Sequence, residues 1–264
     1  MTAQSSPAAS IATMFSLEGR SALVTGASQG IGRAIAVGLA AHGARVCCVA
    51  RNADGLAQTI ELIKKEGGAA SIAYAADLRS QEGIDGAVQA AVNAFGGLDI
   101  LVNNAADDHD SSIEETDLET WRRVVDLNLD SCYRLCRAAG PSLKQRGMGK
   151  VINVVSILAA VGVRNNSAYI AAKSGLLGFT KALALEWARQ GVQVNAVGPG
   201  FIKTSMTRHV WEDEKSSKWI VNRTPVGRWG QPDDLIGAVV FLASPGSNFV
   251  TGQALYVDGG WLAQ

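Results

Sequence analysis

The stretch ALVTGASQGIGRAIA, residues 22–36, joins a short apolar run to small and apolar residues at helical spacing. Its first five residues predict a buried β-strand, and GRAIAVGLAAHG (32–43) predicts the helix that follows. Between them Gly26, Gly30 and Gly32 have the spacing Gly-x3-Gly-x-Gly. Such glycines permit a tight turn and bring an anionic group close to the backbone N–H groups of a helix start. The stretch therefore predicts a nucleotide-binding strand–turn–helix unit, with an ordinary glycine turn as the alternative.

The alternation of strand and helix continues to the end of the chain. The predicted strands are 22–26, 45–50, 71–77, 99–105, 150–156, 192–200 and 254–260, and helix-length segments such as 118–140 and 174–191 lie between them. Near-continuous apolar strands joined by helices are typical of a parallel sheet covered on both faces. We therefore expect an α/β fold, a single doubly wound Rossmann-type domain with a seven-stranded parallel sheet flanked by helices. It would span residues 16–264, after a flexible N-terminal extension over 1–15.

Composition narrows the classes of partner. The 264 residues are 47% hydrophobic, the formal net charge is zero, and no block of like charges occurs. We therefore expect neither nucleic acid nor a membrane surface as a partner. The first fifteen residues carry no basic residue, unlike a secretory signal, and no apolar run is long enough to span a bilayer. These features favour a cytoplasmic protein.

The four cysteines do not form an evident metal site. Cys47 and Cys48 are adjacent in a predicted strand, so their side chains would point to opposite faces of the sheet. Cys132 and Cys136 are one helical turn apart and could share a metal, but no histidine or further cysteine is close in sequence. We expect small buried apolar side chains in a reduced cytosol and no metal.

The predicted architecture indicates where a ligand would bind. In open parallel sheets this is the crevice beyond the carboxyl ends of the strands. Polar residues and glycines follow those ends, namely Gly26, Asp77, Asn104, Ser156 and Pro199–Gly200. A long excursion over 201–227 then interrupts the rhythm, is rich in charge and contains Trp211 and Trp219. We expect it to be a lid over the site, with a solvated surface helix as the alternative.

The end of the second predicted strand discriminates between the two nicotinamide cofactors. An acidic residue there would bind the adenosine 2′-hydroxyl of NAD and repel the 2′-phosphate of NADP. The chain has Ala50 and Arg51 at this point, and arginine suits a phosphate. Asp54 comes later and reads as the N-cap of the next helix. The sequence favours NADP over NAD.

Reactive side chains gather in the second half of the chain. In NSAYIAAKSG (166–175), Tyr169 and Lys173 are four residues apart and would share one helix face. A nearby ammonium should lower the pKa of the phenol and prepare a general acid. Ser156 can hydrogen-bond a carbonyl oxygen. Asn128 lies in the middle of a predicted helix, where either a backbone or water contact in a proton path or simple solvent exposure would explain it.

These motifs together resemble the short-chain dehydrogenase/reductase family. The matching stretches are TGASQGIG, the DL of AADLRS, NNA, the Asn of LNL, VVS, YIAAK, VGPGFIKTSM and VDGG. The resemblance implies a Rossmann-type fold, hydride transfer between NAD(P)H and a carbonyl or alcohol, and a homotetramer.

The resemblance also implies the site residues. Tyr169 would be the general acid/base, Ser156 would orient the substrate oxygen, Lys173 would bind the nicotinamide ribose, and Asn128 would hold a water that relays protons to Lys173. The implied cofactor-binding residues are Gly26, Ser28, Gly30, Ile31, Gly32, Arg51, Asp77, Leu78, Asn104, Ala105, Tyr169, Lys173, Pro199, Gly200, Ile202 and Thr204. One position departs from the family pattern, because Ala106 replaces the glycine of Asn-Asn-Ala-Gly. Backbone strain there would cost on the order of 1 kcal/mol.

The substrate is indicated by stretches near the two ends. FSLEGRSALVTG (15–26), NRTPVGRWGQPDDLIGAVVFLAS (222–244) and YVDGGWLA (256–263) resemble gluconate 5-dehydrogenases and keto-deoxygluconate 5-dehydrogenases, or else reflect general family background. A keto sugar acid such as 5-ketogluconate needs a cation for its carboxylate, and Arg164 and Arg208 are the candidates. His109 could reach the same pocket or be an exposed loop residue.

Other functions stay open at this point. A 3-ketoacyl-carrier-protein reductase or a broad carbonyl reductase would use the same reactive residues. Outside enzymes, the chain could be an NADP-binding regulatory protein with idle catalytic residues.

Overall fold

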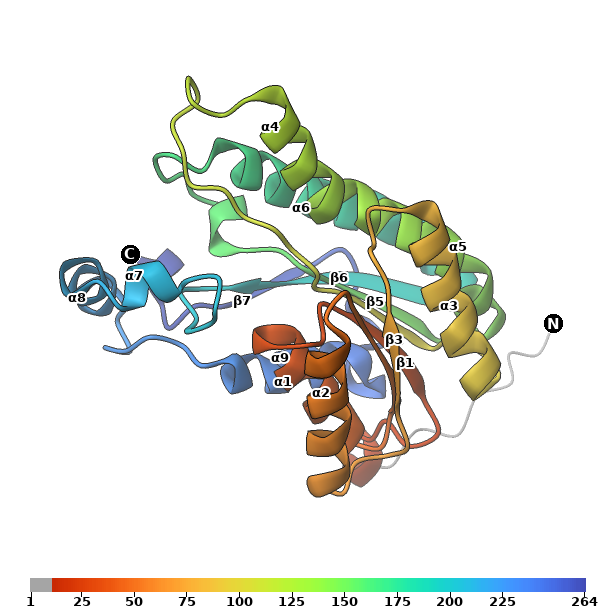
Figure 1. The fold of residues 1–264 in the computed structure, drawn as a ribbon. Coiled ribbons are helices and arrows are strands. Elements are labelled where there is room, and N and C mark those ends of the chain that lie inside the picture. Colours follow the sequence, from red (N-terminus) through yellow and green to blue (C-terminus); the bar gives the residue numbers. More distant parts are fainter. Residues whose placement is uncertain (1–10) are drawn as a thin grey trace.

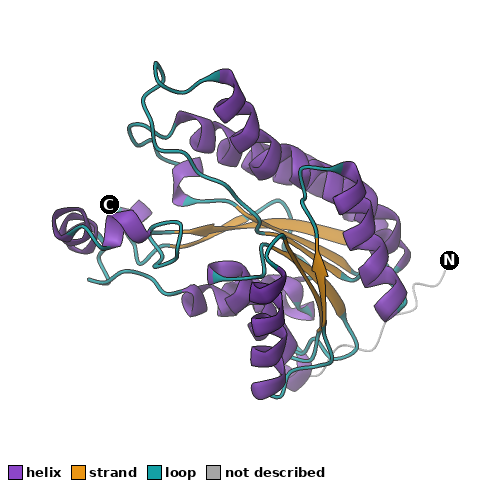
Figure 2. Ribbon diagram, viewed as in Figure 1, coloured by secondary structure: helices purple, strands orange, loops and turns teal. Residues whose placement is uncertain are grey.

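The computed structural model describes residues 11–264, and its centre is a seven-stranded parallel sheet (Figure 2). The strand order is β3-β2-β1-β4-β5-β6-β7, so the order reverses between β1 and β4. The strands are β1 (Ser21–Thr25), β2 (Arg45–Ala50), β3 (Ile72–Ala75), β4 (Ile100–Asn103), β5 (Gly149–Val154), β6 (Val192–Pro199) and β7 (Ala254–Val257). The predicted fold class and all seven predicted strands are confirmed.

Helices cover both faces of this sheet (Figure 1). On one face the core side chains come from α1 (Gly30–Ala41), α2 (Ala53–Lys65) and α9 (Ile236–Ala243). On the other face they come from α3 (Gln81–Phe95), α5 (Ser131–Gln145) and α6 (Ser167–Trp187), with α4 (Leu118–Val125) leading into α5. Two further helices, α7 (Arg208–Trp211) and α8 (Glu214–Arg223), lie beyond the carboxyl end of the sheet. None of the helices from residue 11 onward is long and apolar enough to cross a membrane.

The cysteines occupy the core as the sequence predicts. Cys47 packs in the apolar cluster on one face of the sheet and Cys48 in the cluster on the other. Cys132 and Cys136 are also buried, and burial raises the pKa of all four thiols. They contribute as small apolar side chains.

Most observed strands end before their predicted boundaries. β3 ends at Ala75 and β4 at Asn103, so Asp77 and Asn104 belong to the loops that follow. Ser156 likewise follows β5 by two residues. These polar residues therefore lie just beyond the carboxyl edge of the sheet. They are not part of the hydrogen-bonded strand pairs and can face a ligand.

The N-terminal extension predicted over 1–15 is only partly described, because residues 1–10 lie outside the described residues. Ile11–Thr13 form a short 3-10 turn. The Phe15 ring then lies 6.4 Å from that of Phe241 on α9, and the Met14 carbonyl accepts a hydrogen bond from the Gly246 N–H at 3.0 Å. The chain is therefore in contact with the domain from Met14 onward.

Candidate active site

A cavity of about 1200 Å³ lies at the carboxyl edge of the sheet. Its walls come from the loops after β1, β2, β3, β4, β5 and β6, together with α6, α7 and α8. This includes the point between β1 and β4 where the strand order reverses, which is where ligands bind in folds of this class. Every predicted cofactor-binding residue lines it: Gly26, Ser28, Gly30, Ile31, Gly32, Arg51, Asp77, Leu78, Asn104, Ala105, Tyr169, Lys173, Pro199, Gly200, Ile202 and Thr204.

Two glycines of the first loop have geometries that a side chain would prevent. Gly26 adopts a φ of 67°, in the left-handed region that L-residues rarely enter. A Cβ on Gly32 would lie 2.3 Å from the Gly26 carbonyl oxygen, so the start of α1 can pack against the loop only without one. The N-cap residue of α1, Gln29, makes no side-chain capping hydrogen bond, which leaves the first-turn N–H groups for an anion.

Asn104 supports this loop. Its backbone N–H donates to Thr25 Oγ1 at 2.9 Å and its Nδ2 donates to the Thr25 carbonyl oxygen at 2.8 Å. Its neighbour Asn103 is buried and donates to Asn153 Oδ1 at 2.8 Å. Asn104 therefore lines the cavity, whereas Asn103 is part of the core.

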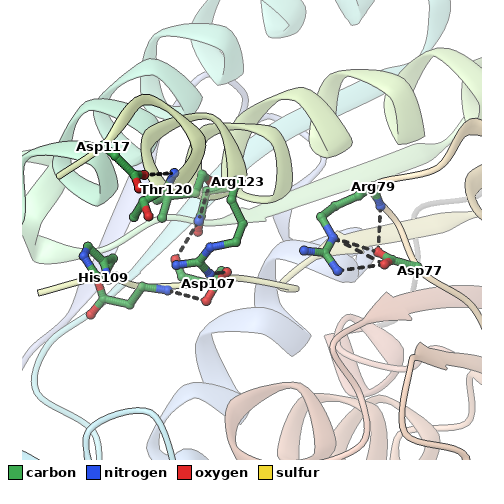
Figure 3. Close-up of polar contacts among 10 residues, drawn as sticks. Asp77, Arg79, Asp107, His109, Asp117, Thr120 and Arg123 are labelled. Atoms are coloured by element: carbon green, nitrogen blue, oxygen red, sulfur yellow. Dashed lines mark hydrogen bonds and ion pairs between the residues drawn. The ribbon is translucent and has the colours of Figure 1, made fainter.

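The far end of the cavity has the charge pattern that the sequence predicts. Arg51 follows β2 and is exposed at the cavity, where no carboxylate ends the strand. Asp77 accepts three side-chain hydrogen bonds from Arg79, which lower the pKa of its carboxyl group (Figure 3). The N-cap assignment for α2 was wrong: Asn52 caps the helix by accepting from the Gly55 N–H, and Asp54 lies in its first turn.

The reactive residues meet at the other end of the cavity. Ser156 and Tyr169 line this end together, the Ser156 hydroxyl acts to lower the pKa of the Tyr169 phenol, and Lys173 Nζ lies 5.5 Å from the centre of the Tyr169 ring. Lys173 Nζ also donates to the Val154 carbonyl oxygen at 2.8 Å. The helical spacing and the strand end thus place a hydroxyl, a phenol and an amine around one point in the cavity.

The predicted pKa direction for Tyr169 is wrong. Burial raises the pKa of the phenol, the charge of Asp108 raises it further, and the Ser156 hydrogen bond opposes both only in part. Burial also lowers the pKa of Lys173, to about 8. Removal from water penalises both charged forms, and this outweighs the attraction between an ammonium and a phenolate. Tyr169 is therefore held as a neutral phenol, which is the form that donates a proton.

Asn128 is fully buried, so solvent exposure does not explain its position. It lies in a π-helical turn, Asp126–Asp130, that packs against α6. Its Nδ2 donates to the backbone carbonyls of Asp107 at 2.7 Å and Val124 at 2.8 Å. Within the described residues its Oδ1 has no hydrogen-bond partner. The widened helical turn thus fixes the amide and leaves one acceptor for a ligand such as water.

Much of the segment 201–227, which the sequence predicts to be a lid, lines the cavity. Its lining residues are Phe201, Ile202, Thr204, Ser205, Met206, Thr207, His209, Val210, Lys215, Ser216, Trp219 and Ile220. Trp219 on α8 packs against Trp261 near the C-terminus, with ring centres 5.6 Å apart. Trp211 instead turns toward Thr204, whose carbonyl oxygen accepts its indole N–H at 3.1 Å.

The structure separates the two candidate carboxylate anchors. Arg164 lines the cavity, whereas Arg208 does not and lies 3.8 Å from Glu212 on an exposed face of α7. His109 is also absent from the lining of the described cavity. Ala106 does line it, but Asn165 is the one non-glycine residue with a positive φ in the described part of the chain. The strain expected at Ala106 is therefore not present.

Several residues that line the cavity were not predicted from the sequence, among them Asp108, Asn166, His209 and Lys215. Asp108 lies in the run DDHD (107–110), a few residues after β4. A group of carboxylates just after a strand end is a signal that could have found it.

Comparison with known proteins agrees with this site. The sequence model of the family described as Enoyl-(Acyl carrier protein) reductase matches residues 26–262. The chain is 42% identical to 2-dehydro-3-deoxy-D-gluconate 5-dehydrogenase of Bacillus subtilis (strain 168), over 95% of this chain and 97% of that protein. It is 40% identical to 3-oxoacyl-[acyl-carrier-protein] reductase of Vibrio cholerae, over 92% of this chain and 98% of that one.

A solved structure also matches over almost the whole chain. The gluconate 5-dehydrogenase of Burkholderia cenocepacia J2315, in complex with NADP and tartrate, superposes with a TM-score of 0.90 at 36% identity, over 95% of this chain and 98% of that one. Fold and site define a Rossmann-type oxidoreductase. The chain belongs to the short-chain dehydrogenase/reductase family.

Proposed function

We propose that the protein is an NADP(H)-dependent oxidoreductase that transfers hydride between the nicotinamide and a keto sugar acid such as 5-ketogluconate. The observation that carries the proposal is the meeting of Ser156, Tyr169 and Lys173 in one cavity with the cation of Arg164. The names of the relatives support it, since two of the three described above are dehydrogenases of gluconate or keto-deoxygluconate.

The residues present fit NADP. The Gly26–Gly32 turn leaves room that a Cβ would fill, and an uncapped helix start faces the same space. Arg51 at the end of β2 suits a 2′-phosphate, and no carboxylate at that strand end would repel it. Bound NADPH would supply the hydride.

The protein's own part in the reaction is proton transfer and orientation. In this proposal Ser156 donates a hydrogen bond to the substrate carbonyl oxygen, and Tyr169 donates its proton to the same oxygen as negative charge develops there. One N–H group of Lys173 Nζ is bonded to the Val154 carbonyl oxygen, and the remaining N–H groups donate to the cofactor ribose. Asn128, through its unpaired Oδ1, holds a water that returns a proton toward Lys173. Arg164 binds the substrate carboxylate.

The proposed activity is tested by the rate of NADPH and NADH oxidation with 5-ketogluconate, acetoacetyl thioester and simple ketones. Selective NADPH-dependent turnover of 5-ketogluconate is expected. Turnover of the thioester instead would overturn the substrate assignment and favour the 3-ketoacyl reductase, to which the Vibrio relative gives equal sequence support.

A second measurement separates an enzyme from an NADP-binding regulatory protein. Tyr169→Phe removes the proton donor and keeps the ring. It should lower kcat by about 10²- to 10⁴-fold while the dissociation constant of NADPH changes little. Equal activity of the variant and the wild type would show that the phenol is idle.

We also propose that the protein is a cytoplasmic homotetramer. Exposed apolar side chains on the surface support self-association, since Leu185 on α6 is 82% exposed and Phe249 is fully exposed. Light scattering should then give four times the 27.6 kDa of one chain. A mass equal to one chain at micromolar concentration would contradict it.

A further inference from the structure

The loop after β4 contributes two carboxylates, Asp108 and Asp110, to the cavity lining, and Asp107 is held by contacts outside it. Asp107 forms an ion pair with Arg123 on α4, and its backbone carbonyl accepts from Asn128 Nδ2 (Figure 3). Asp108, the next residue, lines the cavity. The two contacts of Asp107 fix the backbone from which the Asp108 side chain projects.

Asp108 is itself held in place from the opposite loop. Its Oδ1 accepts hydrogen bonds from Asn166 Nδ2 at 3.0 Å and from the His109 N–H at 2.8 Å. A second bond joins the same two loops, from the Ser111 N–H to the Asn165 carbonyl oxygen at 2.7 Å. Asn165 has a φ of 61°, and strain of this kind persists where the surrounding structure enforces it.

This arrangement leaves polar capacity unused inside the cavity. Asp108 Oδ2 has no hydrogen-bond partner within residues 11–264, although Oδ1 has two. Asn166, only 8% exposed, also lines the cavity, and its Oδ1 is unpartnered within the same residues. A buried acceptor such as Asn166 Oδ1 is costly unless a ligand that carries donors satisfies it, and Asp108 Oδ2 offers the same ligand a charged acceptor.

Asp108 also shares the cavity with the reacting groups Ser156, Tyr169 and Lys173. Burial is the main cause of the raised pKa of Tyr169, and the negative charge of Asp108 is the next. The same charge acts on Lys173. Asp108 therefore lines the cavity in which Tyr169 and Ser156 would bind a carbonyl oxygen, and its charge acts on these reacting groups.

We propose that Asp108 is a specificity-determining residue that accepts hydrogen bonds from hydroxyl groups on the carbon atoms next to the substrate carbonyl. This rests on the proposed function and deepens it, because it assigns the hydroxyl-recognising group of the site. The substrate carboxylate then lies away from Asp108, toward Arg164. An aliphatic chain at the same place would leave the Asp108 charge buried and unpaired, so the residue selects against acyl substrates as well.

The test compares two keto acids that differ only in their hydroxyl groups, 5-ketogluconate and 5-oxohexanoate. Asp108→Asn keeps the size of the side chain and an acceptor for Asn166. It should lower kcat/KM for 5-ketogluconate by about 10- to 100-fold and leave kcat/KM for 5-oxohexanoate equal or higher. Glu114 lies in the same loop but does not line the cavity. The control variant Glu114→Gln should therefore leave kcat/KM unchanged for both keto acids.

A binding measurement gives a readout independent of turnover. Calorimetry with D-gluconate should show weaker binding to Asp108→Asn than to the wild type by a similar factor, while hexanoate binds both equally. An equal loss for both ketones, or unchanged gluconate binding, would overturn the role of Asp108. Wild-type protein that reduces neither keto acid would instead overturn the proposed function.

Discussion

At the scale of single residues, side chains that are equivalent candidates in the sequence differ in their position relative to the cavity. Arg164, between Ser156 and Tyr169, and Arg208, in the predicted lid, are both candidates for the carboxylate anchor in the sequence. In the folded chain Arg164 faces the cavity and Arg208 lies beside Glu212 on the surface of the lid. An exposed ion pair of that kind contributes little to stability. It therefore does not fix the Arg208 side chain in a position to bind a substrate.

This difference gives the first prediction. Arg164→Ala should raise KM for 5-ketogluconate by about 10- to 100-fold, because a charge-assisted hydrogen bond to the carboxylate is lost. Arg208→Ala is the matched control, and steady-state kinetics should give its KM within about twofold of the wild type. A normal KM in Arg164→Ala would remove this residue as the carboxylate anchor.

At the scale of elements, the strand–turn–helix unit of β1 and α1, which we propose binds the cofactor phosphates, depends on close backbone contact. Gly32→Ala should destabilise the protein by about 2–3 kcal/mol and weaken NADPH binding, because its Cβ would meet the Gly26 carbonyl group. Urea unfolding and NADPH fluorescence titration measure the two effects. Gly178→Ala, in α6 with open space around the new Cβ, should instead stabilise by about 0.5–1 kcal/mol.

The segment 201–227, which we propose to be a lid, is anchored by aromatic packing. Trp261 is 6% exposed, its ring centre lies 4.7 Å from that of Phe201, and Arg223 stacks over both Trp261 and Trp219. These contacts join the lid helix α8 to the C-terminal segment. The lid therefore depends on the last residues of the chain for its position.

Trp261→Ala should accordingly raise KM for the keto acid about tenfold with a smaller change in NADPH affinity, because α8 loses its support. Trp187→Ala removes a comparably buried ring from α6, on the far side of the sheet core, and serves as control. Both variants should unfold at lower temperature, but only the first should change KM. The same KM in both would show that the Trp261 contacts are structural alone.

At the scale of the whole molecule, buried titratable groups set the dependence of stability on pH. Burial raises the pKa of Cys47 and Cys48 to about 12, and those of Cys132, Cys136 and Tyr169 are also raised. These groups keep their protons in the folded state at a pH where the unfolded chain loses them. Their contribution to stability is complete below pH 9 and is lost as pH rises toward 12.

Two buried lysines act in the opposite direction. The pKa values of Lys150 and Lys173 are lowered from 10.5 to about 8, so their contribution to stability grows with pH between these values. Five groups with raised pKa values outweigh two with lowered ones. Urea midpoints should therefore fall above about pH 9. Cys136→Ala should reduce the slope of that fall, and an unchanged slope would contradict the assignment.

The sequence by itself determined the order of strands and helices, the glycine turn and the reactive residues. These depend on local chemistry: apolar runs, residues that permit a tight turn, and Tyr169 and Lys173 one helical turn apart. It also placed Arg51 at the end of a strand, which is enough to predict the cofactor preference. Each of these features depends on neighbours close in the chain.

Only the tertiary structure decided what depends on distant parts of the chain. It buried Asn128 in a π-helical turn, gave Asn103 to the core and reversed the expected pKa shift of Tyr169. It also brought Asp108 to Asn166, 58 residues further along the chain. Burial and long-range contacts set solvation and charge, and these have no signature in the spacing of neighbouring residues.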